Sequence, residues 1–494
     1  MLKIPIRFGT DGWRAVISDE FTFENVRHVA QAIADYILEA TEGAKGFPSD
    51  PSVPPVPSVV VGFDTRFLSD RYAMAVAEVL AANGLRVILS RSHCPTPALS
   101  YAVRSLGAAA GVMITASHNP PRYNGLKIKA PHGGAASVEE TRRIEARLHA
   151  NLAQGRAPLV MPYEEALAAG AIRRLNLLPI YLDHIRGLVD LKALGRADLR
   201  VAVDPMYGAG RGYLRSILAG AGCEVLEIRG ELNPGFGGIH PEPIERNLAA
   251  LVAAVRDNRC DVGLATDGDA DRIGAVDAQG RFISPHLIFA LVLRHLVEQW
   301  GLRGAVVKTV STTRMIDLLA SRYGLEVYET PVGFNHICEL ILSNDVLIGG
   351  EESGGITIKG HIPEGDGILM GLLLLEVMAT YGRPLHVIIG ELMDEIGHFY
   401  YGRHDIEARS FSKQELVKRL TAEAPSRICG LTVKGINSSD GVKYLLEEDS
   451  WLLIRPSGTE PVLRIYAEAR SPEMVGRLLE AGAELAGVER TAPS

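Results

Sequence analysis

The sequence predicts an α/β fold built from three related units, because one pattern of strand, loop, helix and strand occurs three times. In each copy an apolar strand leads into a helix-like stretch, a glycine closes that stretch, and a second apolar strand follows. This order is typical of a parallel βαβ unit. The paired strands are expected at residues 59–62 and 84–89, 200–204 and 222–227, and 305–308 and 324–329.

Each unit is followed by a further helix-like stretch and another apolar strand, and these three strands end in polar loops. The loops begin at Thr115, Asp267 and Gly349. In open α/β sheets, ligands bind at the carboxyl ends of the strands, so we expect one loop from each unit in a shared cleft. Residues 400–469 instead read as a strand, a helix and paired strands, which predicts a smaller α+β domain.

The first loop carries a serine that is suited to act as a nucleophile. Residues 115–120 read TASHNP and follow an apolar run that begins at residue 111. Proline disfavours the helical conformation for the residue before it, so Asn119-Pro120 marks a turn. We therefore expect Ser117 to be exposed on a stiff scaffold, within reach of a phosphoryl donor.

The second loop, DGDADR at residues 267–272, places three carboxylates at alternate positions after the apolar run 261–266. Three oxygen donors from one short loop suit a hard divalent cation. An EF-hand is excluded, because it needs Gly and Glu where this chain has Arg272 and Ala278. A solvated acidic turn would not explain carboxylates at a strand end beside an arginine, so we predict a metal site.

Two further loops have residues suited to a phosphorylated sugar. In residues 349–355 (GGEESGG), glycines let the backbone approach a ligand while Glu and Ser side chains bind hydroxyls. In residues 455–461 (RPSGTEP), an arginine can bind a phosphate bidentately, and hydroxyls and loop amides can complete the site. Taken alone, the first is equally an ordinary glycine-rich turn and the second a hairpin turn.

Together the four loops, in this order, closely resemble those of the α-D-phosphohexomutase family, and the similarity begins at residues 8–14 (FGTDGWR). Bacterial phosphoglucomutases/phosphomannomutases are the most similar members. The resemblance implies three α/β domains with mixed sheets plus a smaller C-terminal α+β domain around a central cleft. The expected domains are I with the phosphoserine loop (1–172), II with the metal loop (173–279), III with the sugar-recognition loop (280–396) and IV with the phosphate-binding loop (397–494).

The activity that this resemblance implies is an isomerase of the phosphotransferase type that interconverts hexose 1-phosphate and 6-phosphate. Phosphorylated Ser117 would give its phosphoryl group to the free hydroxyl of the substrate, and the resulting 1,6-bisphosphate would turn over in the cleft and return its other phosphate. Mg²⁺ is the implied cofactor, with glucose 1,6-bisphosphate as activator. The implied metal ligands are Ser117, Asp267, Asp269 and Asp271.

The resemblance also assigns roles to single residues. Lys127 stands where the family carries its proposed general acid/base, with a surface lysine as the alternative, and Arg272 and Arg14 would stabilise the transferring phosphate. His118 either shapes the turn of the nucleophile or is a structural histidine, and Arg66 either lies near the site or anchors its loop. The expected substrate contacts are Gly333, Glu351, Ser353, His361, Arg455, Ser457, Gly458 and Thr459.

Two positions depart from the family pattern. Many relatives have Lys or Arg at the position of Gly365, and related bacterial enzymes with mixed mannose and glucose activity have His at Gly355. A second proton-transfer group or phosphate contact is therefore missing at both expected places. Lys359 or His361 is a candidate replacement.

Glucose phosphate is the expected substrate, because the double glutamate at residues 351–352 resembles phosphoglucomutases. Mannose phosphate comes second. Phosphoglucosamine mutases usually have Gln at Glu352 and His at Gly355, so glucosamine phosphate comes third. Alternatives from other classes are a sugar-phosphate phosphatase, which would not need the sugar and phosphate loops, and an inactive scaffold, which the retained Ser117 and aspartates oppose.

Composition excludes several other classes. The formal net charge of −8 argues against a nucleic-acid or membrane-surface partner. The ligands that the resemblance implies are small hexose phosphates. The five scattered cysteines fit reduced thiols, and the longest apolar run, residues 368–375, is too short to span a bilayer. We expect a cytoplasmic monomer or homodimer. Residues 43–58, with five prolines, are expected to form an exposed insertion rather than a polyproline ligand.

Overall fold

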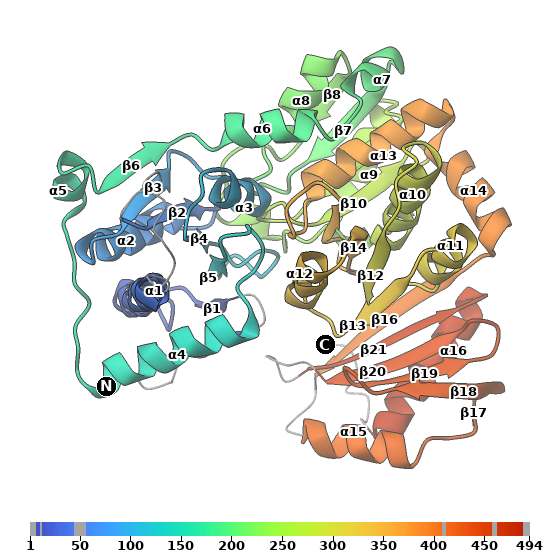
Figure 1. Cartoon of the computed structure of the whole chain (residues 1–494). Helices are drawn as coiled ribbons and strands as arrows, with labels where there is room; N and C mark the ends of the chain where they lie inside the picture. Colours follow the sequence, from blue (N-terminus) through green and yellow to red (C-terminus); the bar gives the residue numbers. More distant parts are fainter. Residues whose placement is uncertain (1–5, 10–11, 44–55, 408–411, 457–461, 488–494) are drawn as a thin grey trace.

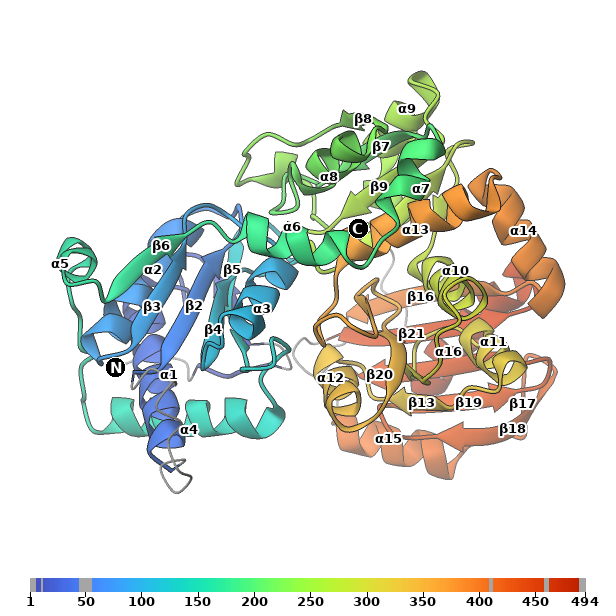
Figure 2. The ribbon, with the colours of Figure 1, turned by 45° about the horizontal axis from the view of Figure 1, so that its top comes forward.

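The computed structural model describes residues 6–9, 12–43, 56–407, 412–456 and 462–487, which form four consecutive domains (Figure 1). In Figures 1 and 2 domain I, in blue to turquoise, lies at the left, domain II, in green, at the top, and domains III and IV, in yellow to red, at the right. Most of the proline-rich insertion lies outside the described residues.

Domain I is a six-stranded mixed sheet with the strand order β1-β5-β4-β2-β3-β6. Strands β2, β3, β4 and β6 are parallel, whereas β5 runs antiparallel to both β4 and β1. Helix α4 begins with a capping box formed by Ser137 and Glu140, which satisfies exposed amides of its first turn. The elements are β1 (Trp13–Val16), α1 (Phe23–Gly43), β2 (Ser58–Phe63), α2 (Ser69–Ala82), β3 (Arg86–Ser90), α3 (Thr96–Ser105), β4 (Ala110–Ile114), β5 (Tyr123–Lys129), α4 (Val138–Ala153), α5 (Tyr163–Ala168) and β6 (Ile172–Leu175).

Domains II and III repeat the central part of this sheet. Their strand orders are β11-β10-β9-β7-β8 and β13-β12-β14-β15, so the predicted parallel βαβ units are confirmed in all three domains. Domain II consists of α6 (Leu178–Arg186), α7 (Leu191–Arg196), β7 (Arg200–Asp204), α8 (Tyr213–Ala221), β8 (Glu224–Glu227), α9 (Ala249–Asp257), β9 (Val262–Thr266), β10 (Ile273–Asp277) and β11 (Phe282–Ile283), with short 3₁₀ turns at Phe236–Gly238 and Glu245–Asn247.

One helix of domain III also belongs to the core of domain II. Helix α13 contacts α7, α8 and β10 as well as α10, and one hydrophobic core runs through both domains. Almost every residue of α13 is buried, which explains its uniformly apolar sequence. The elements are α10 (Pro285–Glu298), β12 (Ala305–Thr309), α11 (Met315–Tyr323), β13 (Val327–Thr330), α12 (Phe334–Ser343), β14 (Val346–Gly350), β15 (Ile356–Ile358), α13 (Gly367–Tyr381) and α14 (Leu385–Ile396).

Domain IV has the predicted α+β architecture. Its antiparallel strands follow the order β16-β21-β20-β19-β18-β17, and α16 packs against β16, β20 and β21. The elements are β16 (Tyr400–Glu407), α15 (Lys413–Ala422), β17 (Arg427–Ile428), β18 (Leu431–Asn437), β19 (Val442–Leu446), β20 (Trp451–Pro456), β21 (Val462–Ala469) and α16 (Pro472–Ala486).

Two predicted boundaries fall beside strands. β6 begins at residue 172 and pairs with β3, and β11 follows residue 279 and pairs with β10, so both sheets continue past the expected limits. Cys94, Cys223, Cys260 and Cys338 are buried, Cys429 is partly exposed, and none is in a disulfide. Among the described residues no single helix is long and apolar enough to cross a membrane; α13 and α14 reach that length only as a pair bent by 84°.

Candidate active site

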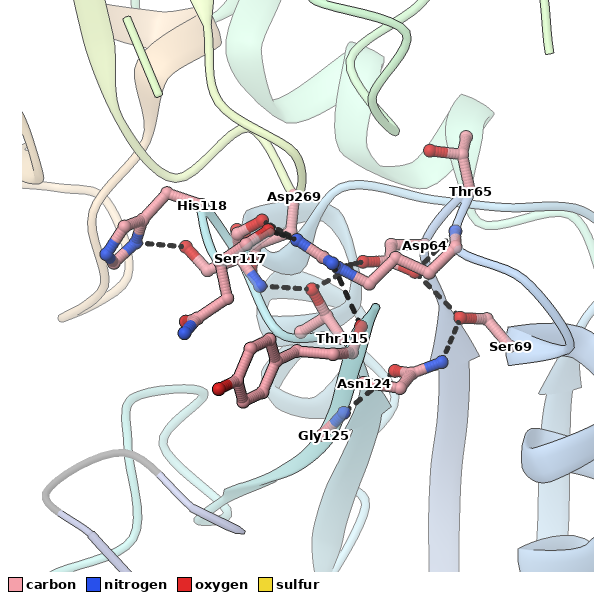
Figure 3. A network of polar contacts seen from close by, with 12 residues as sticks. Asp64, Thr65, Ser69, Thr115, Ser117, His118, Asn124, Gly125 and Asp269 are labelled. Carbon is pink, nitrogen blue, oxygen red and sulfur yellow. Dashed lines mark hydrogen bonds and ion pairs between the residues drawn. The ribbon is translucent and has the colours of Figure 1, made fainter. Parts of the chain in front are cut away.

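Ser117 lies in the turn between β4 and β5, with His118 beside its hydroxyl and Asp269 of domain II nearby (Figure 3). Ser117 Oγ donates to Asp267 Oδ2 at 2.7 Å and lies 3.4 Å from His118 Nδ1. The residue is only 1% exposed, which corrects the expectation of an exposed nucleophile. Its φ of 49° lies in the left-handed region, which is unfavourable for a serine. The surrounding contacts must therefore stabilise this backbone conformation.

Arg66 provides most of those contacts. Its guanidinium donates to four backbone carbonyl oxygens of the turn, which belong to Ser117, Asn119, Pro120 and Tyr123, at 2.6–2.9 Å. Asp64 holds the same guanidinium at 3.1 Å. Arg66 therefore anchors the loop and, through its contact with the Ser117 carbonyl oxygen, also lies next to Ser117.

Asp64 extends this network into the sheet (Figure 3). It accepts hydrogen bonds from Thr115 Oγ1 at 2.7 Å and from Ser69 Oγ at 2.8 Å, and Asn124 in turn donates to Ser69 at 2.9 Å. Ser117 thus stands on a fully buried polar scaffold, which fixes the direction of its side chain.

The three aspartates of domain II could hold a metal ion beside Ser117. Carboxylate oxygens of Asp267, Asp269 and Asp271 lie within 4.8 Å of one another. The buried Oδ1 atoms of Asp269 and Asp271 have no hydrogen-bond partner among the described residues, as expected for ligands of a hard cation. A Cβ on Gly268 would lie 2.4 Å from the Ser117 carbonyl oxygen, so only glycine lets the two loops approach this closely.

Lys127 and Thr96 of domain I contact the same aspartates. Lys127 Nζ lies 2.8 Å from Asp271 and 3.0 Å from Asp269, and the side chain is buried, which excludes the surface-lysine alternative. Burial alone would raise the pKa of Asp269, but Lys127 and the Thr96 hydrogen bond lower it below its usual value. Burial and the other two aspartates raise the pKa of Asp267 well above its usual value.

Thr96→Val should weaken activation by Mg²⁺. Thr96 Oγ1 donates to Asp269 Oδ2 at 2.6 Å, so it fixes the direction of an expected ligand. Because such partners orient metal ligands, we expect the Mg²⁺ concentration for half-maximal activity to rise by about tenfold or more. Metal titrations of activity measure this, with Thr141→Val, in helix α4, as a control. If both variants needed the same Mg²⁺ concentration for half-maximal activity, this would contradict the proposed role of Thr96 in orienting Asp269.

Arg14, Arg272 and His118 lie around the Ser117 loop and the acidic loop. Arg14 donates to Asn119 Oδ1 at 2.7 Å, and Arg272 lies 3.9 Å from Asp271. Burial, followed by the charges of Arg272 and Arg14, lowers the pKa of His118 well below its usual value. His118 is therefore neutral near pH 7, and the cationic character of this side of the site comes from the arginines.

The sugar-recognition loop joins the metal loop through the backbone, because Ile273 N donates to Gly354 O at 3.2 Å. Glu351 accepts from Gly333 N at 2.9 Å and from Ser353 Oγ at 3.2 Å, which brings three predicted substrate contacts together. Burial, followed by the neighbouring charge of Glu352, raises the pKa of Glu351 to about 7.

Glu352 has different partners from Glu351. Its Oε2 accepts hydrogen bonds from Ser311 Oγ at 2.7 Å and from Thr309 Oγ1 at 3.2 Å, at the end of β12. The side chains of the two glutamates of the motif therefore have different partners, Glu351 near Gly333 and Ser353 and Glu352 at the end of β12.

Replacing Glu351 by Gln should change how stability depends on pH. Glu351 binds its proton more tightly in the folded protein than in the unfolded chain, so its stabilising contribution is full below pH 4.5 and is lost as the pH rises through about 7. Glutamine cannot ionise, so the variant should gain free energy of unfolding relative to wild type from about pH 5 to about pH 8. Urea unfolding of both proteins at about pH 5 and about pH 8 measures the difference in free energy of unfolding between variant and wild type. The same difference at both pH values would contradict the prediction.

Arg455, expected to bind phosphate, lies at the end of β20 and is paired with a residue that the sequence did not single out. Its Nε donates to Asp440 Oδ2 at 2.6 Å. Burial opposes the charge, but Asp440 outweighs it and raises the pKa of Arg455. Ser457, Gly458 and Thr459 lie outside the described residues.

His361 does not join the other predicted substrate contacts. Its side chain is fully buried, with Nε2 2.9 Å from Asp366 Oδ2 and Nδ1 2.9 Å from His184 Nε2. Both ring nitrogens are therefore used within the protein, and Asp366 also caps helix α13. The expectation that His361 binds substrate is corrected to a structural role, and Lys359 pairs at the surface with Asp345.

The two departures from the family pattern lie against each other. A Cβ on Gly365 would be 2.7 Å from the Asp271 carbonyl oxygen and 2.9 Å from Gly355 Cα, so a longer side chain has no room there. The ring of Phe334 lies 3.4 Å from the Cβ position of Gly355. The missing basic groups thus coincide with close packing of the loops of domains II and III.

Comparisons with known proteins identify the family. Sequence models of the phosphoglucomutase/phosphomannomutase family match in order: alpha/beta/alpha domain I at residues 5–154, domain II at 179–280, domain III at 284–396 and the C-terminal domain at 413–485. A phosphoglucomutase/phosphomannomutase of Thermococcus kodakarensis is 32% identical over 482 residues, covering 97% of this chain and 98% of that protein.

Two further relatives carry other substrate names. A protein of Methanothermobacter thermautotrophicus, provisionally named phosphoglucosamine mutase, is 33% identical over 471 residues and 95% of each chain. A crystal structure from Thermus thermophilus, of a protein provisionally named phosphomannomutase, has a TM-score of 0.82 and 40% identity, covering 98% of this chain and 99% of the other. The chain is therefore a phosphohexomutase that belongs to the phosphoglucomutase/phosphomannomutase family.

Proposed function

We propose that this phosphohexomutase interconverts glucose 1-phosphate and glucose 6-phosphate, with Ser117 as the carrier of the phosphoryl group. The observation that supports this most is the 2.7 Å hydrogen bond from Ser117 Oγ to Asp267, within an acidic group that has unpartnered carboxylate oxygens. A buried hydroxyl held in this way is suited to bear a phosphate beside a cation.

In the proposed transfer, the bond from phosphorus to Ser117 Oγ breaks and a bond from phosphorus to the substrate's free hydroxyl oxygen forms. Lys127, whose Nζ is oriented by Asp269 and Asp271 at 3.0 and 2.8 Å, gives a proton to Ser117 Oγ as that oxygen leaves and takes the proton of the attacking hydroxyl in its place. Arg14 and Arg272 stabilise the negative charge of the phosphoryl oxygens during transfer. Reversal at the other end of the bisphosphate returns a phosphoryl group to Ser117.

Asp267, Asp269, Asp271 and Ser117 would hold Mg²⁺, which would neutralise charge on the phosphoryl oxygens. Other side chains would bind the sugar ring and the second phosphate of the substrate. Glu351 and Ser353 would bind sugar hydroxyls, and Arg455 would bind the phosphate that is not reacting. Because the sugar must react at both ends, contacts with hydroxyls suit either orientation. Trace glucose 1,6-bisphosphate would act as activator by loading Ser117.

Glucose is proposed ahead of mannose and glucosamine because of the Glu351-Glu352 pair, although relatives carry names for all three activities. Formation of glucose 6-phosphate from glucose 1-phosphate, with Mg²⁺ and with or without trace bisphosphate, tests the proposal. Stimulation by bisphosphate is expected, together with a higher kcat/KM for glucose 1-phosphate than for mannose or glucosamine 1-phosphate. Release of inorganic phosphate in place of the isomer would identify a phosphatase and overturn it.

A further inference from the structure

Domain IV contacts domain III through the turn between β18 and β19 and through strand residues on either side of it. Asn437 Nδ2 and Lys443 Nζ both contact Glu329, at 2.8 and 2.7 Å, and Asp440 Oδ2 accepts a hydrogen bond from Val332 N at 3.0 Å. These contacts all fall on residues 329–332, the segment that leads from β13 to Gly333.

Asp440 differs from its neighbours in this turn because it also holds Arg455. The same oxygen, Oδ2, accepts from Val332 N and from Arg455 Nε, so one carboxylate joins the two domains to the expected phosphate-binding side chain. Binding through Nε leaves the two terminal guanidinium nitrogens of Arg455 as the atoms suited to a bidentate phosphate contact. The Asp440 carboxylate therefore sets the direction in which the guanidinium faces.

The chain of hydrogen bonds continues to the sugar site. Gly333 directly follows Val332, and its N–H donates to Glu351 Oε1 at 2.9 Å. Arg455, Asp440, residues 332–333 and Glu351 thus form a continuous path from the expected phosphate contact to the expected sugar contact. A shift of Arg455 toward a bound phosphate would move Asp440 and, through Val332, the amide that orients Glu351.

We propose that Asp440 is a positioning residue that couples the phosphate contact of domain IV to the sugar contact of domain III. This inference depends on the proposed function, because it takes Arg455 and Glu351 as substrate contacts. Asp440 itself touches no reacting atom. It keeps Arg455 and Glu351 in the relative positions that one hexose phosphate can satisfy at the same time.

Asp440→Asn tests the coupling with little change of shape. The variant loses the charge that holds Arg455, and we expect the KM for glucose 1-phosphate to rise by about tenfold or more, as for loss of a hydrogen bond to a charged group. If the path exists, the rise in KM caused by Asp440→Asn should be clearly smaller in a Glu351→Gln background than in wild type. Residues coupled through one network show such non-additive effects.

Lys443→Met is the matched control, because it removes a contact between the same two domains without touching Arg455. Glu329 keeps Lys308 and Asn437 as partners, and thermal unfolding of each variant reports any loss of stability. An equal change of KM in Asp440→Asn and Lys443→Met would overturn the coupling and leave a general interface effect. The coupling would also be overturned if the KM of the double variant rose by the product of the two single-variant factors for Asp440→Asn and Glu351→Gln. Wild-type protein that turned over no hexose phosphate would instead refute the proposed function, and the coupling with it.

Discussion

Ser117→Ala is expected to lower kcat by at least about 10⁴-fold, because the variant has no oxygen to carry the phosphoryl group. The loss should be one of chemistry and not of folding, since Ser117 N still donates to Thr115 Oγ1 and Arg66 still binds the carbonyl oxygens of the turn. The rate of glucose 6-phosphate formation and the thermal unfolding temperature of the variant measure both parts of this expectation.

Ser100→Ala is the matched control for this prediction. Ser100 is another buried serine of domain I, and its hydroxyl has no hydrogen-bond partner among the described residues. We expect its turnover and unfolding temperature to stay close to wild type. A Ser117→Ala protein that kept more than roughly one hundredth of wild-type turnover would contradict a covalent role for Ser117.

Arg66→Met is expected to lower the free energy of unfolding by about 3–5 kcal/mol, the usual cost of removing one partner from a buried ion pair. The substitution leaves Asp64 without its cation and four carbonyl oxygens of the turn without this donor. Because the same contacts hold Ser117 in a left-handed conformation, turnover should fall as well. Urea unfolding and kcat report the two effects.

Arg66→Lys tests the charge of Arg66 separately from its hydrogen bonds to the carbonyl oxygens of the turn. Arg66→Lys keeps a cation beside Asp64 but cannot donate to four carbonyl oxygens, so it should recover stability more fully than turnover. Arg186→Met, in an exposed pair with Asp183, is the control and should cost about 1 kcal/mol or less. An Arg66→Met protein as stable as this control would contradict the anchoring role.

The repeated βαβ pattern and the strand-end loops could be predicted from the sequence, because each depends on residues that are close together along the chain. The apolar runs form β4, β9 and β14, and the polar loops at their carboxyl ends meet in space, with Ser117 2.7 Å from Asp267. Helix α13 was different: its apolar run was predicted only to be too short for a membrane span, and nothing in it indicated that the helix would join the cores of two domains.

The supporting residues of the site depend on contacts between distant segments. Thr96 bonds to Asp269, 173 residues away, and its sequence context gave no signal of this contact. Arg66 acts through backbone carbonyl oxygens, which any sequence would offer. The role of His361 was predicted wrongly, because a histidine beside a glycine-rich loop can either contact a ligand or form a buried hydrogen bond to a carboxylate. Only the folded structure brings Asp366 and His184 to its ring.

The most direct test of a phosphoserine mutase is to follow the phosphoryl group itself. Wild-type protein would be treated with glucose 1,6-bisphosphate and then freed of ligand. One portion would be mapped by peptide mass spectrometry directly, and a second portion would be mapped after mixing with glucose 1-phosphate and Mg²⁺. We predict one phosphoryl group on Ser117 that disappears as glucose 1,6-bisphosphate forms. Phosphate that stayed on Ser117, appeared on another residue, or was released to water as inorganic phosphate would contradict the mechanism.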